Sequence, residues 1–237
     1  MLKGKRIVVL GGTAGIGLGV AERLVEEGAR VVVASSNQAR VDEARKRLGG
    51  AEGFAVNLRS PEAITALFAE VGAFDHLIYT AGEELLFSSL DQLDFEKARA
   101  FFDVRYWGAL AAVKAARPHL SREGSIVLTG GTAGTRPFAG FVLGASICGA
   151  MESVTRVLAV ELAPIRVNIV VPGLVDTGLW ANMPEAGRAQ LFDETAAKLP
   201  VGRVGTPADI AEHYLAFLKS RYTTGQSIIV DGGGVLV

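Results

Sequence analysis

Short apolar runs alternate with amphipathic stretches from the start of the chain. Residues 7–10 form a β-branched apolar run, which is typical of a buried parallel strand. Between residues 16 and 25 apolar residues recur at helical spacing, with charged residues on the other face. Residues 31–33 are a run of valines and give a second strand. The pattern predicts a β-α-β unit over residues 6–33.

The same alternation continues to the end of the chain. Further strands are expected at residues 54–56, 76–80, 125–129, 166–171 and 227–230. Helices are expected at residues 41–48, 60–71, 94–119 and 140–162, and from Thr206-Pro207 onward. Residues 178–199 are expected to form a mobile insertion that covers the substrate. We predict an α/β fold with a doubly wound parallel sheet (Rossmann fold) of about seven strands, in a single domain over residues 1–237.

Composition narrows the class of protein. Of 237 residues, 49% are apolar, which argues against disorder. With 24 basic and 25 acidic side chains, the chain offers no charged surface for nucleic acid or an anionic membrane. The one cysteine, Cys148, excludes an internal disulfide and fits a reducing compartment. No apolar run reaches membrane-spanning length and no signal peptide precedes the first strand, so we expect a cytoplasmic protein.

A glycine-rich turn joins the first strand to the first helix. Its spacing is Gly11-x-x-x-Gly15-x-Gly17, with Thr13 and Ile16 inside it. Glycines at such a turn allow the backbone to approach a pyrophosphate, which the helix N-terminus then binds. A turn that binds nothing remains the alternative, but the flanking strand and helix favour the nucleotide.

Several further motifs complete a resemblance that extends over almost the whole chain. They are Tyr79-Thr80-Ala81-Gly82, Val157 to Ala163, Arg166-Val167-Asn168 to Pro172-Gly173 with Thr177, Gly202 to Pro207, Thr224-Gly225 and Val230 to Gly233. Together with the glycine turn they resemble the short-chain dehydrogenase/reductase family, which has Asn-Asn-Ala-Gly in place of the first of them. The resemblance implies a nicotinamide cofactor across the carboxyl ends of the strands. It also implies contacts to this cofactor from Ala81, Gly82, Pro172 and Gly173, Thr177 near the carboxamide, and a homodimer or homotetramer.

The end of the second strand bears on which nicotinamide cofactor is used. An NAD site needs a carboxylate there, but Ser35, Ser36 and Asn37 follow the strand instead. Hydroxyls can donate to a 2′-phosphate, and Arg40 follows as a cationic partner, so we predict NADP(H) in preference to NAD(H). Alternatively, these residues form only a turn and a solvated charge. Asn57-Leu58 stands where the family has Asp-Val or Asp-Leu, and Asn57 could bond the adenine edge.

The expected catalytic positions depart from the family pattern. The resemblance implies an Asn-Ser-Tyr-Lys tetrad, in which the tyrosine protonates the developing alkoxide. By register, the four positions hold Arg105, Gly131, Gly144 and Cys148. The segment 131–148 contains neither tyrosine nor lysine, whatever the alignment.

Two readings of function follow from an intact cofactor turn beside such a site. The first is hydride transfer from NADPH to a reactive carbonyl or quinone, an apolar small molecule, with Arg105 stabilising the developing oxyanion. The second is a catalytically inactive NADP(H) sensor or oligomeric scaffold; a non-redox lyase or isomerase is a further possibility without positive support. Tyr79 or Tyr106 could replace the proton donor, although packing is the better reading of Tyr79. Cys148 has no histidine or cation next to it in sequence, so we interpret it as a small buried residue.

Overall fold

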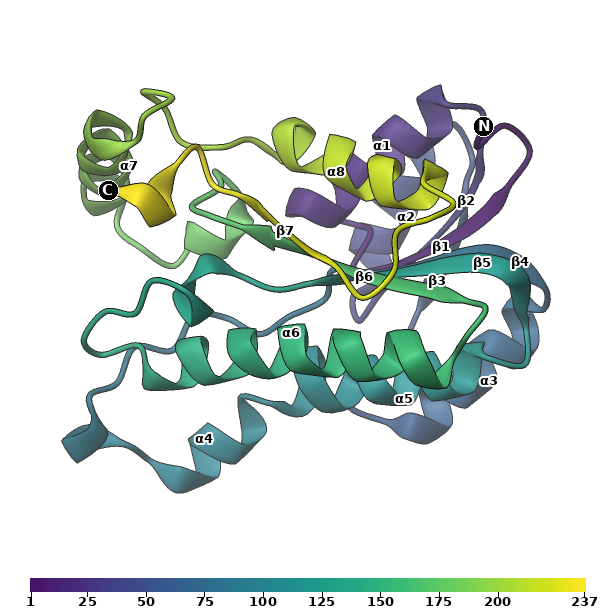
Figure 1. The fold of residues 1–237 in the computed structure, drawn as a ribbon, viewed down its shortest axis with the longest axis horizontal. Coiled ribbons are helices and arrows are strands. Elements are labelled where there is room, and N and C mark those ends of the chain that lie inside the picture. The colour runs from purple at the N-terminus through teal and green to yellow at the C-terminus, as the bar shows by residue number, and fades with distance from the viewer.

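A computed structural model describes all residues 1–237, and its centre is one parallel β-sheet with helices on both faces (Figure 1). The strands are β1 (Arg6–Leu10), β2 (Arg30–Ser35), β3 (Glu52–Ala55), β4 (Phe74–Tyr79), β5 (Leu120–Thr129), β6 (Arg166–Pro172) and β7 (Ser227–Val230). Their order in the sheet is β3-β2-β1-β4-β5-β6-β7, and every neighbouring pair is parallel. The predicted doubly wound α/β fold is confirmed.

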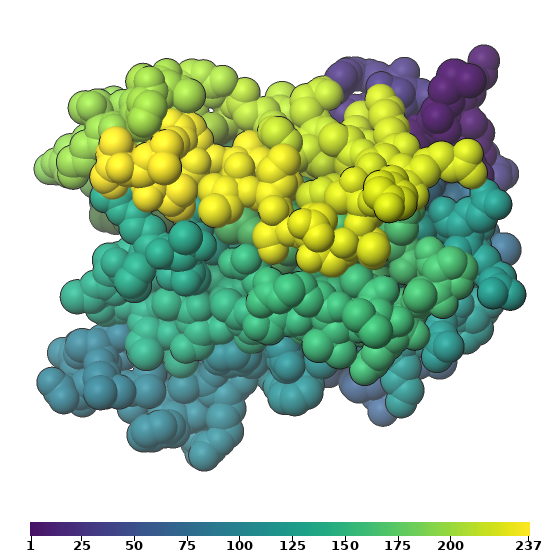
Figure 2. Space-filling view, in the orientation of Figure 1, coloured from purple at the N-terminus to yellow at the C-terminus, as the bar shows by residue number.

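The helices form one layer on each side of the sheet. They are α1 (Gly15–Glu26), α2 (Gln38–Arg47), α3 (Pro61–Val71), α4 (Phe95–Ala100), α5 (Ala109–Ala116), α6 (Val142–Glu161), α7 (Glu185–Lys198) and α8 (Pro207–Lys219). Helices α3, α5 and α6 cover one face, while α1, α2 and α8 cover the other (Figure 1). Helix α7 stands at the end of the molecule beside the C-terminus, and the C-terminal segment forms a surface band between the two helical layers (Figure 2).

The apolar runs of the strands are buried on both faces of the sheet. Val8 and Leu10 of β1 belong to a core of 27 buried residues on one face, and Ile7 and Val9 belong to a core of 20 on the other. Because successive side chains of a strand point to opposite faces, a strand covered on both sides reads as a continuous apolar run. This explains why the strands could be located from the sequence.

Local capping signals set two helix starts as predicted. Ser60 accepts a hydrogen bond from the amide of Ala63 at the start of α3, and Pro61 is the first helical residue. Thr206 and Asp209 form a capping box at the start of α8. Each of these caps satisfies backbone N–H groups that the helix itself leaves without a partner.

The helix expected over residues 94–119 is interrupted, so that prediction was wrong in part. Between α4 and α5 lies a π-helix, Asp103–Gly108. The carbonyl of Phe102 accepts from the amides of both Tyr106 and Trp107, which marks the change from i+4 to i+5 bonding. Two side chains from outside the segment also bond its backbone: Glu83 accepts from the amide of Arg105, and Tyr79 donates to the carbonyl of Val104. Such long-range partners leave no periodic signal in the sequence.

Helix α6 is long and apolar enough to cross a membrane by length and composition alone, which no single apolar run in the sequence suggested. In this fold it packs against the sheet, and Met151 and Leu158 lie in the core. A core helix of this kind passes the same test of length and composition.

A buried histidine makes the stability of the fold depend on pH. His76 lies in β4, 6% exposed, opposite Ser125 of β5, and its Nδ1 has no hydrogen-bond partner. Burial lowers the pKa of His76 to about 4, Asp75 acting in the opposite sense. Since the unfolded chain has the higher pKa, it binds the proton first. This contribution to stability is therefore complete above about pH 6.5 and is lost as the pH falls toward 4.

We predict that His76→Gln removes this dependence. The fall in unfolding free energy from about pH 7.5 to about pH 5 should be about 2 kcal/mol smaller in the variant than in the wild type. Urea unfolding of both proteins at the two pH values measures the difference. An equal fall in both proteins would show that His76 is not the titrating group.

Candidate active site and cofactor cleft

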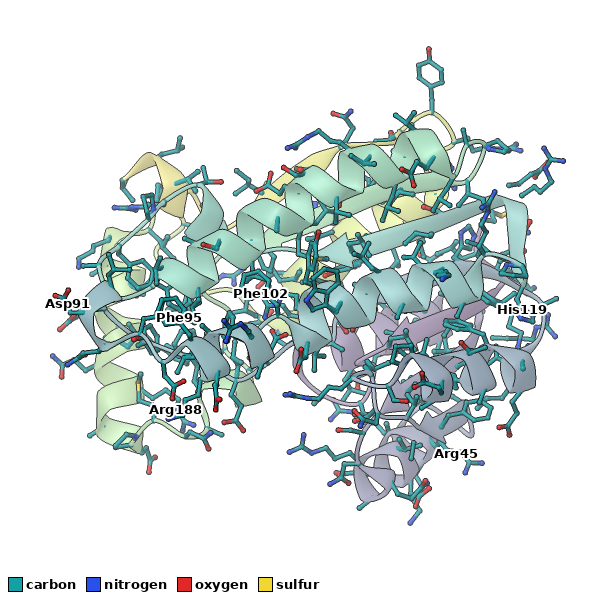
Figure 3. The ribbon with its side chains drawn as sticks, turned by 90° about the horizontal axis from the view of Figure 1, so that it is seen from below. Arg45, Asp91, Phe95, Phe102, His119 and Arg188 are labelled. Atoms are coloured by element: carbon teal, nitrogen blue, oxygen red, sulfur yellow. The ribbon has the colours of Figure 1, made fainter.

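The candidate site lies at the carboxyl ends of the strands. Viewed from below, Asp91 and Phe95 lie at the same end of the molecule as Arg188 of α7, and His119, which precedes β5, lies at the opposite end (Figure 3). The chain leaves β1 and β4, which are neighbours, toward opposite faces of the sheet. Such a point where the winding reverses opens a crevice that holds ligands in doubly wound folds.

The glycine turn after β1 packs tightly against the segment after β4. Thr80 donates to the carbonyl of Leu10 from both its amide (2.8 Å) and its hydroxyl (3.1 Å). Gly11 has a φ of +88°, and a Cβ there would lie 2.6 Å from the amide nitrogen of Ala81. A Cβ on Gly17 would overlap the carbonyl oxygen of Gly11. Side chains are therefore excluded at both glycines by backbone contact.

The N-terminus of α1 is left free for an anion. Gly15, with a φ of +51°, begins the helix after Ala14, whose side chain makes no capping bond. The first turn has no acidic residue, in contrast to those of α3 and α8. Thr13, Ile16 and the glycines thus surround uncapped amides, an arrangement that fits a pyrophosphate.

The segment after β6 reaches the same turn. A Cβ on Gly15 would be 3.3 Å from the Cβ of Thr177, so this predicted residue does lie beside the phosphate turn. Thr177 is held by a hydrogen bond from the amide of Leu179 to its hydroxyl. Pro172 ends β6, and Gly173 packs against Asp231, where a side chain would not fit.

The predicted adenosine end lies where β2 and β3 finish. The amide of Val56 donates to the carbonyl of Ser35, which places Asn57 beside the second strand. The side chain of Asn37 caps α2 by accepting from the amide of Arg40, and this cap is why α2 begins three residues before the predicted start at residue 41.

The other side chains at the predicted adenosine end differ in whether they are buried or hydrogen-bonded within the chain. Asn57 accepts from the amide of Arg59, and Leu58 is buried. Ser36 and Arg40 are exposed, and the side chain of Arg40 makes no hydrogen bond or ion pair within the chain. Both are therefore free to meet a ligand.

The four residues assigned by register to the catalytic positions lie close to one another in the fold. A Cβ on Gly131 would be 3.0 Å from Sγ of Cys148. A Cβ on Gly144 would overlap the ring of Phe141. The guanidinium of Arg105 lies against Gly82, where its Nη2 would be 2.6 Å from an added Cβ. Phe141 and Cys148 thus occupy the positions next to the two glycines where larger side chains would lie.

Sequence reasoning missed Glu83, which pairs with Arg105. One oxygen of its carboxylate accepts from the amides of Val104 (3.2 Å) and Arg105 (2.7 Å), and the other lies 3.6 Å from Nε of Arg105. An acidic residue directly after Ala81-Gly82 was a visible signal. Its partner, however, is 22 residues away along the chain and is identified only by the fold.

Cys148 and Tyr79, two other candidate site residues, are both buried. Cys148 is 4% exposed, as expected of a small buried residue, but the fold brings the Arg105 guanidinium beside it. Burial raises the pKa of the Cys148 thiol, while Arg105 acts to lower it. Burial also raises the pKa of Tyr79, whose hydroxyl donates to the carbonyl of Val104 at 2.5 Å. Tyr79 is therefore buried, and its hydroxyl proton is already engaged by the Val104 carbonyl, as expected of a packing residue.

The insertion over residues 178–199 contains α7 and bends toward the site. Trp180 donates from Nε1 to the carbonyl of Val175 (3.0 Å) and packs edge-on against Phe192. Asn182 donates to the carboxylate of Glu84 (3.2 Å) in the segment after β4. The insertion thus contacts the opposite wall of the cleft.

Comparisons with known proteins agree with this geometry. The family model described as Enoyl-(Acyl carrier protein) reductase matches residues 11–234. The short-chain dehydrogenase/reductase fsr5 of Gibberella fujikuroi is 34% identical over 254 residues, covering 99% of this chain and 96% of that protein.

Two solved structures are similar over their full length. A small-chain dehydrogenase in complex with NADPH is 37% identical with a TM-score of 0.88, covering 99% of this chain and 100% of that one. The MalC reductase/Diels-Alderase from Malbranchea aurantiaca is 27% identical with a TM-score of 0.93, covering 100% and 98%. Since the family match and these likenesses span nearly every element of the fold, the chain belongs to the short-chain dehydrogenase/reductase family.

Proposed function

We propose that this protein is an NADP(H)-dependent oxidoreductase that reduces a reactive carbonyl or quinone without a Tyr-Lys acid-base pair. The observation that carries the proposal is the combination at the carboxyl ends of the strands. There, the glycine turn and the uncapped start of α1 lie next to Gly82, against which the guanidinium of Arg105 packs, and Gly131 packs against Cys148.

The cofactor proposal rests on the turn after β1 and on a structural neighbour. Gly11, Gly15 and Gly17 would hold the pyrophosphate against the uncapped start of α1, and Thr177 lies beside them. The similar small-chain dehydrogenase was solved with NADPH. When bound, the nicotinamide would supply the hydride; the chain has to orient the acceptor and stabilise the charge that forms.

Preference for the 2′-phosphate rests on Ser35, Ser36 and Arg40. No carboxylate stands at the end of β2 to repel a phosphate, and the exposed Arg40 side chain has no internal partner to compete for it. Hydroxyl donors and a guanidinium are suited to a phosphate dianion. Asn37 supports this site through its backbone position, because its side chain caps α2.

The lining of the reaction space limits the substrate. General acid-base catalysis contributes about 10²–10⁴-fold, so a site without the family's tyrosine-lysine pair suits acceptors whose product anion is delocalised or is protonated readily by water. Quinones and α-dicarbonyls meet this condition. Arg105 supplies fixed positive charge to the developing oxyanion, the role that preorganised donors have in other enzymes.

An aromatic shelf beside Gly144 favours a flat apolar acceptor. It consists of Phe87, Phe138 and Phe141, with ring centroids 4.8 Å apart for Phe138–Phe141 and 5.1 Å apart for Phe87–Phe141. Phe87 is 52% exposed and Phe138 is 55% exposed. Exposed aromatic rings such as those of Phe87 and Phe138 can pack on a planar ring.

A second candidate function keeps the cofactor and omits the hydride transfer. The space without a tyrosine or lysine suits an inactive NADP(H) sensor or scaffold, whose oligomer would be built on α5 and α6. The similar MalC protein is named a reductase and Diels-Alderase, which supports non-redox chemistry on this fold as an alternative. Steady consumption of NADPH distinguishes the redox enzyme from both.

We predict that Arg40→Ala weakens NADPH binding by about tenfold and leaves NADH binding unchanged, since only the 2′-phosphate would lose a charge-assisted hydrogen bond. Fluorescence titration of both cofactors against wild type and variant measures this. Arg30→Ala, which removes an exposed charge at the other end of β2, is the matched control. An equal loss for NADH and NADPH would rule out a phosphate-specific role for Arg40.

We further predict that Arg105→Ala lowers kcat for an o-quinone by about 100-fold while the Kd for NADPH changes little, because the lost donor acts on the developing charge. Single-turnover oxidation of NADPH with saturating quinone measures the chemical step. Arg99→Ala on the exposed face of α4 is the control. An unchanged rate would remove Arg105 from the mechanism.

A further inference from the structure

The carboxylate of Glu83 divides its two oxygens between the backbone and the side chain of the same arginine. We propose that Glu83 is a positioning residue: it fixes the Arg105 guanidinium against Gly82 and beside Cys148, where the developing oxyanion would form. The catalytic part of this inference rests on the proposed function. The placement of Arg105 can be tested without it.

The first contact joins the Glu83 carboxylate to the backbone of the π-helix. Oε1 of Glu83 accepts from the amides of Val104 and Arg105, the second at 2.7 Å. These amides belong to the first turn of the π-helix, whose N-terminal residue has no side-chain cap of its own. Glu83 therefore acts as a cap supplied from another segment, and it fixes the Cα of Arg105 relative to the end of β4.

The second contact is the ion pair between the Glu83 carboxylate and the Arg105 side chain. Oε2 of Glu83 is buried, has no hydrogen-bond partner, and lies 3.6 Å from Nε of Arg105. The Glu83 side chain is 6% exposed and that of Arg105 is 20% exposed. A carboxylate oxygen removed from water in this way requires a neighbouring positive charge, and Arg105 is the only ion-pair partner of Glu83.

The Arg105 guanidinium is thus held by Glu83 at its Nε edge. Its Nε edge faces Glu83, its Nη2 lies against Gly82, and it also reaches the thiol of Cys148. An added Cβ on Gly82 would lie 2.6 Å from Nη2, so a side chain there would displace the guanidinium from this position. The guanidinium carries five N–H donors, of which Glu83 faces only Nε, and the side chain is 20% exposed.

Holding a donor before the reaction starts is what gives it catalytic value. An arginine that must be recruited from water loses part of its stabilising effect to reorganisation, whereas a fixed one does not. Glu83 would have this effect without touching the acceptor. Its replacement should therefore act entirely through Arg105.

The single cysteine provides a reporter of where Arg105 lies. Cys148 faces Arg105 from the π-helix, Glu152 on its own helix and the backbone of Gly134. Because Arg105 stabilises the thiolate, moving the guanidinium away should raise the pKa of Cys148. With [3-¹³C]cysteine the protein gives one Cβ resonance, whose shift can be followed through the alkaline range in the absence of cofactor and substrate.

The test compares Glu83→Gln with Arg105→Ala and with the double variant. Glutamine keeps an oxygen that accepts from the two amides but removes the charge that holds the guanidinium. We expect the Cys148 pKa to rise in Glu83→Gln by the same amount as in Arg105→Ala, with no further rise in the double variant. The exposed Glu96→Gln should leave it unchanged. An unchanged or lowered Cys148 pKa in Glu83→Gln, or no change in Arg105→Ala, would overturn the inference.

A kinetic cycle with the same variants tests the catalytic consequence. Glu83→Gln should lower kcat for the o-quinone by about tenfold in the wild type and have no effect in the Arg105→Ala background, with the Kd for NADPH unchanged throughout. Equal losses in both backgrounds would show that Glu83 acts independently of Arg105. If the wild type does not turn over, the proposed function fails, while the nuclear magnetic resonance result still decides whether Glu83 positions Arg105.

Discussion

The proposed site depends on close backbone contact between the turns that follow β1 and β4. Thr80 donates twice to the carbonyl of Leu10, and Gly11 and Gly17 leave no space for a Cβ between the two segments. This contact brings the uncapped start of α1 next to Ala81 and Gly82, and so aligns the phosphate turn with the reaction space. Every other part of the proposed site is placed relative to it.

In the proposed reaction, the positive charge of Arg105 beside Gly82 stabilises the developing oxyanion, in place of proton transfer from a tyrosine-lysine pair. Gly131 packs against the buried thiol of Cys148, Gly144 packs against Phe141, and the proposal gives Arg105 the role of supplying positive charge. The Glu83–Arg105 pair can be formed because the π-helix turns the Arg105 amide toward the end of β4. In this proposal, the Glu83–Arg105 pair orients the residue that takes over from the family's catalytic positions.

Strands and helix starts that are determined by residues close together in the chain could be predicted from the sequence. The five inner strands are buried on both faces, and the starts of α3 and α8 are defined by Ser60-Pro61 and Thr206-Pro207. Helix α7 was not predicted, because none of its residues is buried and its apolar period is weak. The π-helix and the Glu83–Arg105 pair were missed because their partners are distant along the chain. The spacing of the glycine turn, in contrast, placed Thr13, Gly15 and Ile16 correctly at the start of α1.

The most direct test of the account is a fluorescence titration of the wild-type protein with NADPH and NADH, followed in the same cuvette by an o-quinone. We predict that NADPH binds more tightly than NADH and is then consumed catalytically. Failure of both cofactors to bind would contradict the role given to the glycine turn. Binding of NADPH without consumption would contradict the hydride transfer and favour the sensor.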